Sequence, residues 1–393
     1  MIPTARERRL RLFLFGSLYV AQGAILSYFL TFNILYLREF GFTAGDIGFF
    51  QATLVLPFIL KILLGMVSDR FNLFGLGHRH PYIVLGLMIQ IVGLLLMPLV
   101  SLPDDLGLFF ALALAVAIGM ALYDTCTDGL AVETTPADER GLVQGVMVGS
   151  RAGGILIALL LGSLLVDRAG WSWVFWMLAG LTLPGLLLVI AQLKAGRKAR
   201  HARFEWQSLR SLLTRPAAAL ATIGCLYALA TDGLLAYLSF HPDAQQVGTV
   251  GVVGGLVALS MLGRMLGAAA SAALTDRIGR MPALNLSIGL TIAASLALSV
   301  QSGVGVLALA CLVFGVAYGF FTTVYAAHAM QQSPPAAAAS TFAIFMLFLN
   351  LGVAFGQLTG GMLTERLGFS GLAWLMVVVL LVVFGPARAL RAT

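Results

Sequence analysis

The sequence has few charged residues and few cysteines for its length. Only 10% of its 393 residues are charged, whereas soluble domains carry about 25%. The three cysteines lie apart in apolar stretches, which gives no disulfide framework and no zinc site. Hydrophobic residues make up 60% of the chain, and the mean hydropathy is +0.95. This composition excludes a water-soluble enzyme or nucleic-acid-binding protein and predicts a membrane protein with several spans.

Apolar blocks of the length needed to cross a bilayer follow one another along the whole chain. We expect twelve of them, with short loops between most and one long basic linker near the middle. They cover residues 11–37, 44–67, 81–101, 107–134, 141–166, 172–193, 216–239, 247–273, 281–300, 304–330, 336–359 and 370–388. The sequence therefore predicts an all-α protein with an N-terminal six-helix bundle (1–193), a cytoplasmic basic linker (194–215) and a C-terminal six-helix bundle (216–393).

The basic residues predict the orientation of the chain in the membrane. With the N-terminus in the cytoplasm, 18 of the 24 Lys and Arg residues fall on the cytoplasmic side and 3 on the other side. The remaining three, Lys61, Arg151 and Arg264, lie inside predicted spans. We therefore expect both termini to be cytoplasmic, and the net charge of +7 to reflect topology and contact with anionic lipids.

The two halves of the chain resemble each other in sequence. Residues 65–70 (GMVSDR) at the end of the second block match residues 272–277 (AALTDR) at an offset of 207. Residues 162–176 match residues 360–374 at an offset of 198. Parallel six-helix repeats of this kind are typical of a common transporter architecture, in which the halves are related by an axis along the membrane normal.

These two copies of a small residue, three others and Asp-Arg, each followed by a basic residue, resemble the signature loop of the major facilitator superfamily. The resemblance implies a major facilitator fold in which this loop stabilises one conformation and does not bind substrate. A purely topological role explains Arg79 and Arg280 equally well. The candidate latch residues are Gly65, Asp69, Arg70, Asp276, Arg277 and Arg280.

Charged residues inside the predicted spans are the first candidates for function, because burying a charge in a bilayer is costly. Asp124 lies 11 residues, about 16 Å, from the cytoplasmic end of its block, and Arg151 lies 10 residues, about 15 Å, into the next. Asp128 is one helical turn from Asp124. We expect these three to form a cluster with one surplus carboxylate that exchanges a proton, although a structural ion pair is the alternative. At offsets of 198–199 the second half has no matching charges.

The second half offers its own candidates for the lining of a substrate cavity. Arg264 could hold an anionic group of the substrate or pair with Asp232, and the pattern does not decide between them. Lys61 is expected to extend to the cytoplasmic surface. The cavity candidates are Arg264, Asp232, Asn350, Gln22 and Asn33.

Two further motifs point to particular branches of the superfamily. Residues 123–133 (YDTCTDGLAVE) resemble the muropeptide permeases, acetyl-CoA transporters and related siderophore importers. Residues 75–82 (GLGHRHPY) resemble the folate–biopterin transporters and the bacteriochlorophyll-delivery family, with His80 where those proteins favour arginine. The substrate and the direction of transport stay open.

The leading hypothesis is a secondary active transporter of a small organic solute that works by alternating access with proton coupling. The alternative is a membrane assembly or pigment-delivery factor built on the same fold. The sequence has no P-loop motif for ATP, and we expect no enzymatic activity, cofactor, metal or nucleic-acid partner. We expect a monomer in the bacterial inner membrane.

Overall fold

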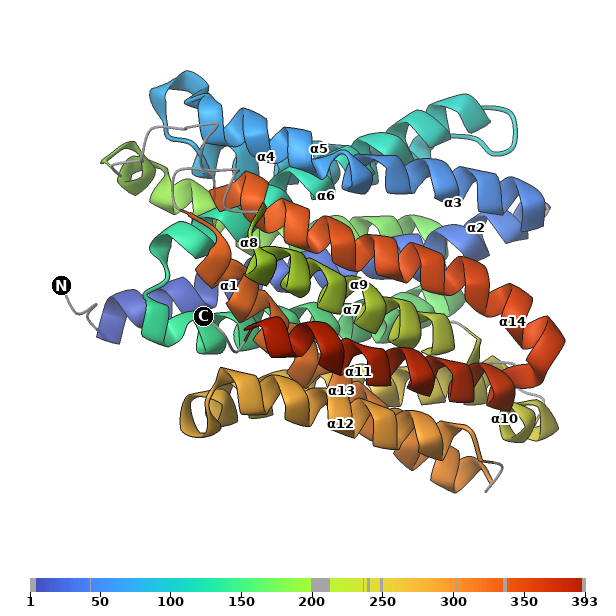
Figure 1. Ribbon diagram of the computed structural model, residues 1–393. Helices are drawn as coiled ribbons and strands as arrows, with labels where there is room; N and C mark the ends of the chain where they lie inside the picture. Colours follow the sequence, from blue (N-terminus) through green and yellow to red (C-terminus); the bar gives the residue numbers. More distant parts are fainter. Residues whose placement is uncertain are drawn as a thin grey trace. The chain divides into compact units, whose positions relative to one another are not determined.

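The computed structural model is built of helices throughout the part of the chain that it describes (Figure 1). That part comprises residues 5–42, 44–198, 213–235, 237–238, 241–247, 250–300, 303–334 and 338–390. The α-helices are α1 (Ala5–Ser27), α2 (Asn33–Glu39), α3 (Ala44–Ile59), α4 (Lys61–Arg70), α5 (His80–Leu96), α6 (Leu106–Thr134), α7 (Arg140–Ala169), α8 (Trp171–Lys198), α9 (Arg215–Leu235), α10 (Pro242–Val247), α11 (Val250–Ile278), α12 (Arg280–Leu298), α13 (Val304–Gln332) and α14 (Ala338–Ala389).

Ten helices in these residues are long and apolar enough to cross a membrane, and residues 340–356 form a shorter apolar helix. An apolar chain in lipid must satisfy its backbone hydrogen bonds internally, which favours helices over irregular structure. This architecture confirms the predicted all-α membrane class.

Two predicted spans are interrupted in the structure, and one long helix turns in the loop between two predicted spans. A π-helix (Tyr28–Phe32) joins α1 to α2, and Leu60 separates α3 from α4 three residues after Pro57. In α14 the chain turns at Gly368, whose φ of 69° is in the left-handed region that glycine adopts without strain.

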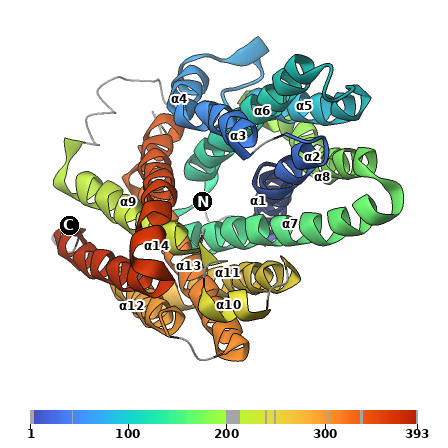
Figure 2. The same cartoon turned by 90° about the vertical axis from the view of Figure 1, so that its right-hand side faces the viewer.

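The contacts between residues divide the chain into two compact units. Unit 1 comprises Met1–Thr134, Ser150–Glu205 and Pro334–Ala343, and unit 2 comprises Thr135–Gly149, Trp206–Ser333 and Ile344–Thr393. Within unit 1, α5 packs against α6 and α8; within unit 2, α13 packs against α11 and α12 (Figure 2). Most of the predicted linker, 194–215, lies outside the described residues, so the predicted boundaries stay predictions.

Glycines allow the tightest helix crossings in both units. In unit 2, a Cβ on Gly319 of α13 would lie 2.0 Å from the carbonyl oxygen of Arg264 on α11, and one on Gly267 would lie 1.9 Å from that of Val316. In unit 1, a Cβ on Gly23 of α1 would lie 2.0 Å from the carbonyl oxygen of Arg151 on α7. Small residues at such crossings bring backbones together in membrane proteins. The crossings at Gly319 and Gly23 therefore set the backbone positions of Arg264 and Arg151.

Substitution of Gly319 tests the α11–α13 crossing. Gly319→Ala should lower the free energy of unfolding by about 1–3 kcal/mol, because the added methyl group meets backbone rather than a movable side chain. Thermal unfolding of the purified protein in detergent, followed by tryptophan fluorescence, measures the loss. Gly305→Ala on the same helix is the matched control, since no atom lies within 4 Å of its Cβ position. Equal melting temperatures for the two variants would contradict the packing argument.

Candidate functional sites

Unit 1 contains a buried charged cluster where α1, α4, α6 and α7 meet. The crossing at Gly23 brings Arg151 beside α1, and the break at Leu60 makes Lys61 the first residue of α4. Asp124 and Asp128 project from α6 and are one helical turn apart. The structure thus brings together the three residues predicted to form a cluster and adds Lys61 to them.

Two side chains of α1 connect the charges of this cluster. The Gln22 amide donates a hydrogen bond to Asp124 through its nitrogen, and its oxygen accepts one from Arg151 Nε at 2.8 Å. The Tyr19 hydroxyl donates to Asp128, and the Arg151 guanidinium lies over the Tyr19 ring, 4.9 Å from its centroid. Arg151 therefore contacts the aspartates through Gln22 and Tyr19 and forms no direct ion pair with them.

Lys61 changes the charge count that the sequence led us to expect. Its Nζ lies 3.4 Å from Asp124, and the residue is 3% exposed. The prediction that this side chain extends to the cytoplasmic surface was therefore wrong. With Lys61 included, the cluster has two carboxylates and two cations. Asp128, also 3% exposed, has the Tyr19 hydroxyl as its hydrogen-bond donor and no ion-pair partner among the described residues.

Unit 2 contains a similar arrangement around Arg264. The Tyr318 hydroxyl donates a hydrogen bond to Asp232 at 3.0 Å, and the Arg264 guanidinium lies over the Tyr318 ring, 3.7 Å from its centroid. One Arg264 nitrogen lies 3.8 Å from Asp232, which is an ion pair beyond hydrogen-bonding distance. Sequence reasoning named Arg264 and Asp232 and missed Tyr318.

The two units thus contain the same triad of an arginine over a tyrosine ring whose hydroxyl donates to an aspartate. In the numbering of the twelve predicted spans, the tyrosines lie on spans 1 and 10. The aspartates lie on spans 4 and 7, and the arginines on spans 5 and 8. These pairs occupy equivalent places in the three-helix repeats nested within each half of this architecture. No charges match at offsets of 198–199, as the sequence shows; the second triad lies elsewhere in the repeat, because the offset of 199 compares α6 with α13 instead of α9.

The other two cavity candidates lie apart from these triads. Asn33 is fully buried at the end of the π-helix, where its side-chain oxygen accepts a hydrogen bond from Tyr28 at 3.0 Å and its nitrogen has no partner. Asn350 lies on α14 with its side chain exposed. Neither prediction is tested by these positions. Among the described residues, no three His, Cys, Asp or Glu side chains lie close enough to hold a metal ion.

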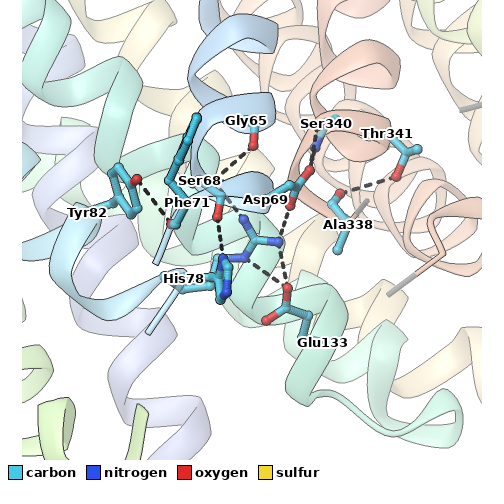
Figure 3. Close-up of polar contacts among 11 residues, drawn as sticks. Gly65, Ser68, Asp69, Phe71, His78, Tyr82, Glu133, Ala338, Ser340 and Thr341 are labelled. Carbon is cyan, nitrogen blue, oxygen red and sulfur yellow. Dashed lines mark hydrogen bonds and ion pairs between the residues drawn. The ribbon is translucent and has the colours of Figure 1, made fainter. Parts of the chain in front are cut away.

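The loop after α4 contains a buried arginine, Arg79, whose partners Ser68, Asp69 and Glu133 are labelled in Figure 3. Arg79 is 2% exposed and donates to Glu133 on α6 at 2.6 and 2.9 Å, to Ser68 at 2.7 Å and to Asp69. Burial acts to lower the pKa of this guanidinium, but the carboxylates of Glu133 and Asp69 outweigh burial and raise its pKa above the ordinary value. Arg79 is therefore charged at every physiological pH.

Asp69 also caps the start of α14, as Figure 3 shows. Its second carboxylate oxygen accepts hydrogen bonds from the backbone N–H of Ser340 at 2.9 Å and from the Ser340 hydroxyl at 2.5 Å. A carboxylate at a helix N-terminus satisfies free backbone donors and interacts favourably with the helix dipole. The first residues of α14 belong to unit 1 and the rest of the helix to unit 2, so Asp69 holds the point where α14 leaves unit 1.

The remaining latch candidates occupy different surroundings. Gly65 lies in α4, and its carbonyl accepts a hydrogen bond from Ser68 at 3.0 Å. Arg70 and Arg277 are exposed, and Arg280 donates to the Ala137 carbonyl at 3.1 Å. The Asp276 side chain lies outside the described part of the structure. The sequence missed Glu133 and Ser340 as partners of Asp69 and Arg79, although the repeat did mark Arg79.

Removing the Arg79 charge should strongly destabilise the protein. Arg79→Gln leaves Asp69 and Glu133 buried without their cation, and loss of one partner of such a network costs about 3–5 kcal/mol. Thermal unfolding in detergent measures this loss, with the exposed Arg70→Gln as the control. Adding Asp69→Asn and Glu133→Gln to Arg79→Gln should restore part of the stability. If the triple variant is no more stable than Arg79→Gln alone, the cost arises from packing and not from charge.

Comparison with known proteins places the chain among transporters. The family model described as Major Facilitator Superfamily matches residues 12–347 and 244–391. A folate-biopterin transporter from Synechocystis is 31% identical over 153 residues, which are 38% of this chain and 30% of the relative. The match thus spans about a third of that relative's length.

Solved structures have the same fold at low sequence identity. The human organic anion transporter MFSD10 superimposes with a TM-score of 0.77 at 16% identity, covering 98% of this chain and 100% of its own. The Escherichia coli fucose:proton symporter FucP gives 0.74 at 15% identity, covering 97% of each chain. An outward-facing bacterial homologue of ferroportin gives 0.77 at 15%, covering 98% and 99%. Because the family model matches most of its length, the chain belongs to the major facilitator superfamily.

Proposed function

We propose that this protein is a proton-coupled secondary active transporter that moves a small organic solute by alternating access of its two units. Membership of the major facilitator superfamily supports solute transport. The observation that carries proton coupling is Asp128, a buried carboxylate held by a tyrosine hydroxyl and without an ion-pair partner among the described residues. The predicted pigment-delivery role stays a prediction.

Asp128 is suited to carry the proton because of its neighbours. An unpaired buried charge is costly, and a carboxylate avoids that cost by binding a proton. Asp124 lies one turn away and already pairs with Lys61. When Asp128 binds a proton, the Tyr19 hydroxyl loses its charged acceptor, and the position of Tyr19 beneath Arg151 is released. Proton binding is thereby linked to the contact between α1 and α7.

The cap at the start of α14 is our candidate for the conformational latch. Asp69 holds Ser340 through two hydrogen bonds, and Arg79 holds Asp69. The rest of α14 belongs to unit 2. We therefore expect a conformational change that displaces α14 to break the hydrogen bonds between Asp69 and Ser340. The other residues that we assign to the latch lie at the end of α4 and in the repeat of this motif: Gly65, Arg70, Asp276, Arg277 and Arg280.

The substrate and the setting complete the proposal. The relative named a folate-biopterin transporter makes folate and biopterin the first solutes to test. We place the protein in a bacterial inner membrane as a monomer with both termini in the cytoplasm, on the strength of the excess of basic residues on that side.

Neutralising Asp128 should remove the response to a proton gradient and leave the substrate path intact. In proteoliposomes, Asp128→Asn should reduce uptake driven by an imposed pH gradient to the level of empty liposomes, because the proton-binding group is lost. Exchange of labelled for unlabelled solute at equal pH should continue, since it needs no net proton movement. The exposed Asp104→Asn, outside the cluster, is the matched control.

The two assays together decide the role of Asp128. Gradient-driven uptake by Asp128→Asn at the rate of the unmodified protein would contradict proton carriage at this residue. Loss of both driven uptake and exchange, with an unchanged melting temperature, would assign Asp128 to substrate binding instead.

A further inference from the structure

Arg264 is partly buried in the second triad, and no described residue forms a hydrogen bond with its side chain. Its Nε is inaccessible to solvent and has no partner, and its nearest charged neighbour, Asp232, lies at 3.8 Å. A guanidinium has five N–H donors, and leaving buried donors unpaired costs free energy. The side chains of Arg264 and Asp232 are 15% and 16% exposed, so a ligand can reach them.

The first triad shows which group is missing from the second. In unit 1, Arg151 Nε donates to the Gln22 side-chain oxygen at 2.8 Å, while the guanidinium lies over Tyr19. In unit 2 the guanidinium lies over Tyr318 in the same manner, but no side-chain oxygen of the described residues accepts a hydrogen bond from Arg264 Nε as Gln22 Oε1 does from Arg151 Nε. The site thus lacks one oxygen acceptor in the plane of the guanidinium.

We infer that Arg264 binds a carboxylate group of a ligand, and that Asp232 competes with this carboxylate for Arg264. The inference rests on the proposed function only in taking the ligand to be the transported solute.

The geometry favours a carboxylate over other anions. Tyr318 covers one face of the guanidinium at 3.7 Å, so a new partner must approach its edge. The planar edge of arginine matches the two oxygens of a carboxylate in a bidentate pair. Asp232 is held away from this position by the Tyr318 hydroxyl and stays at 3.8 Å. The internal carboxylate is therefore close enough to weaken ligand binding and too far to replace the ligand.

The test uses small carboxylates and their neutral amides as probes. Acetate and benzoate, each at about 50 mM, should raise the melting temperature of the full-length protein in detergent, because a ligand of the folded state stabilises it by mass action. Acetamide and benzamide, with sodium chloride added to equal ionic strength, should not. If neither carboxylate raises the melting temperature more than its amide does, the inference is wrong.

Two variants locate the effect, with a third as control. Arg264→Gln should abolish the difference between carboxylate and amide. Asp232→Asn, which keeps the acceptor for Tyr318, should lower the apparent Kd for benzoate by at least about threefold, as removal of a competing charge predicts. The exposed Arg366→Gln of the same unit should behave as the unmodified protein. Weaker or unchanged benzoate binding in Asp232→Asn would overturn the competition, and this holds even if Arg264→Gln does not fold.

This experiment and the transport assay fail independently. Binding in detergent needs no gradient and no transport cycle. Selective carboxylate binding without proton-driven uptake would leave the Arg264 site standing and contradict the proposed function. Proton-driven uptake with no difference between carboxylate and amide would support the proposed function and contradict the Arg264 site.

Discussion

A guanidinium buried among apolar helices must find its partners within the protein, because lipid cannot solvate it. The structure meets this constraint with glycine-lined crossings that bring the backbone of an arginine-bearing helix against its neighbour. At Gly23 and at Gly319, the carbonyl oxygen of the arginine residue itself approaches the glycine. The arginine side chain then lies over a tyrosine ring on the neighbouring helix. The charged chemistry of both units therefore depends on helix packing.

Three arginines inside the protein differ in how fully they are paired, and the difference matches the three roles that we propose. Arg79 donates to two carboxylates and a hydroxyl, which suits a fixed structural element. Arg151 donates to the oxygen of Gln22 and covers the tyrosine that holds Asp128, which suits a cluster that responds to a proton. Arg264 lies over a tyrosine ring near a distant carboxylate and has no hydrogen bond from the described residues, which suits a place for an external anion. The degree of pairing thus distinguishes scaffold from function.

The sequence predicted those features that depend on composition and periodicity. Long apolar blocks and the repeated Asp-Arg loops were sufficient for the fold class, and the depth estimate brought Asp124 and Arg151 to the same level. The sequence could not predict that the helix breaks at Leu60 and that Lys61, at the start of α4, pairs with Asp124. Nor could it predict the pairing of Arg79 with Glu133, because 54 residues separate them and only tertiary structure brings them together.

The sequence analysis missed Tyr318, and with it the likeness of the two triads, for a different reason. Comparing the halves at one offset aligns whole six-helix bundles, whereas the triads follow the three-helix repeats within each half. A tyrosine in an apolar helix also gives no signal of its own. The spacing Gly315-x-x-x-Gly319 was the available clue, since it indicates a close helix approach beside Tyr318.

The most direct test of the account is to measure proton movement during solute entry. Proteoliposomes with a pH-sensitive dye inside, at equal pH on both sides, receive a concentration gradient of labelled folate or biopterin. The account predicts that entry of a transported solute acidifies the interior, with dissipation of the signal by a protonophore. Entry of labelled solute without any change in internal pH would contradict proton coupling and with it the role proposed for Asp128.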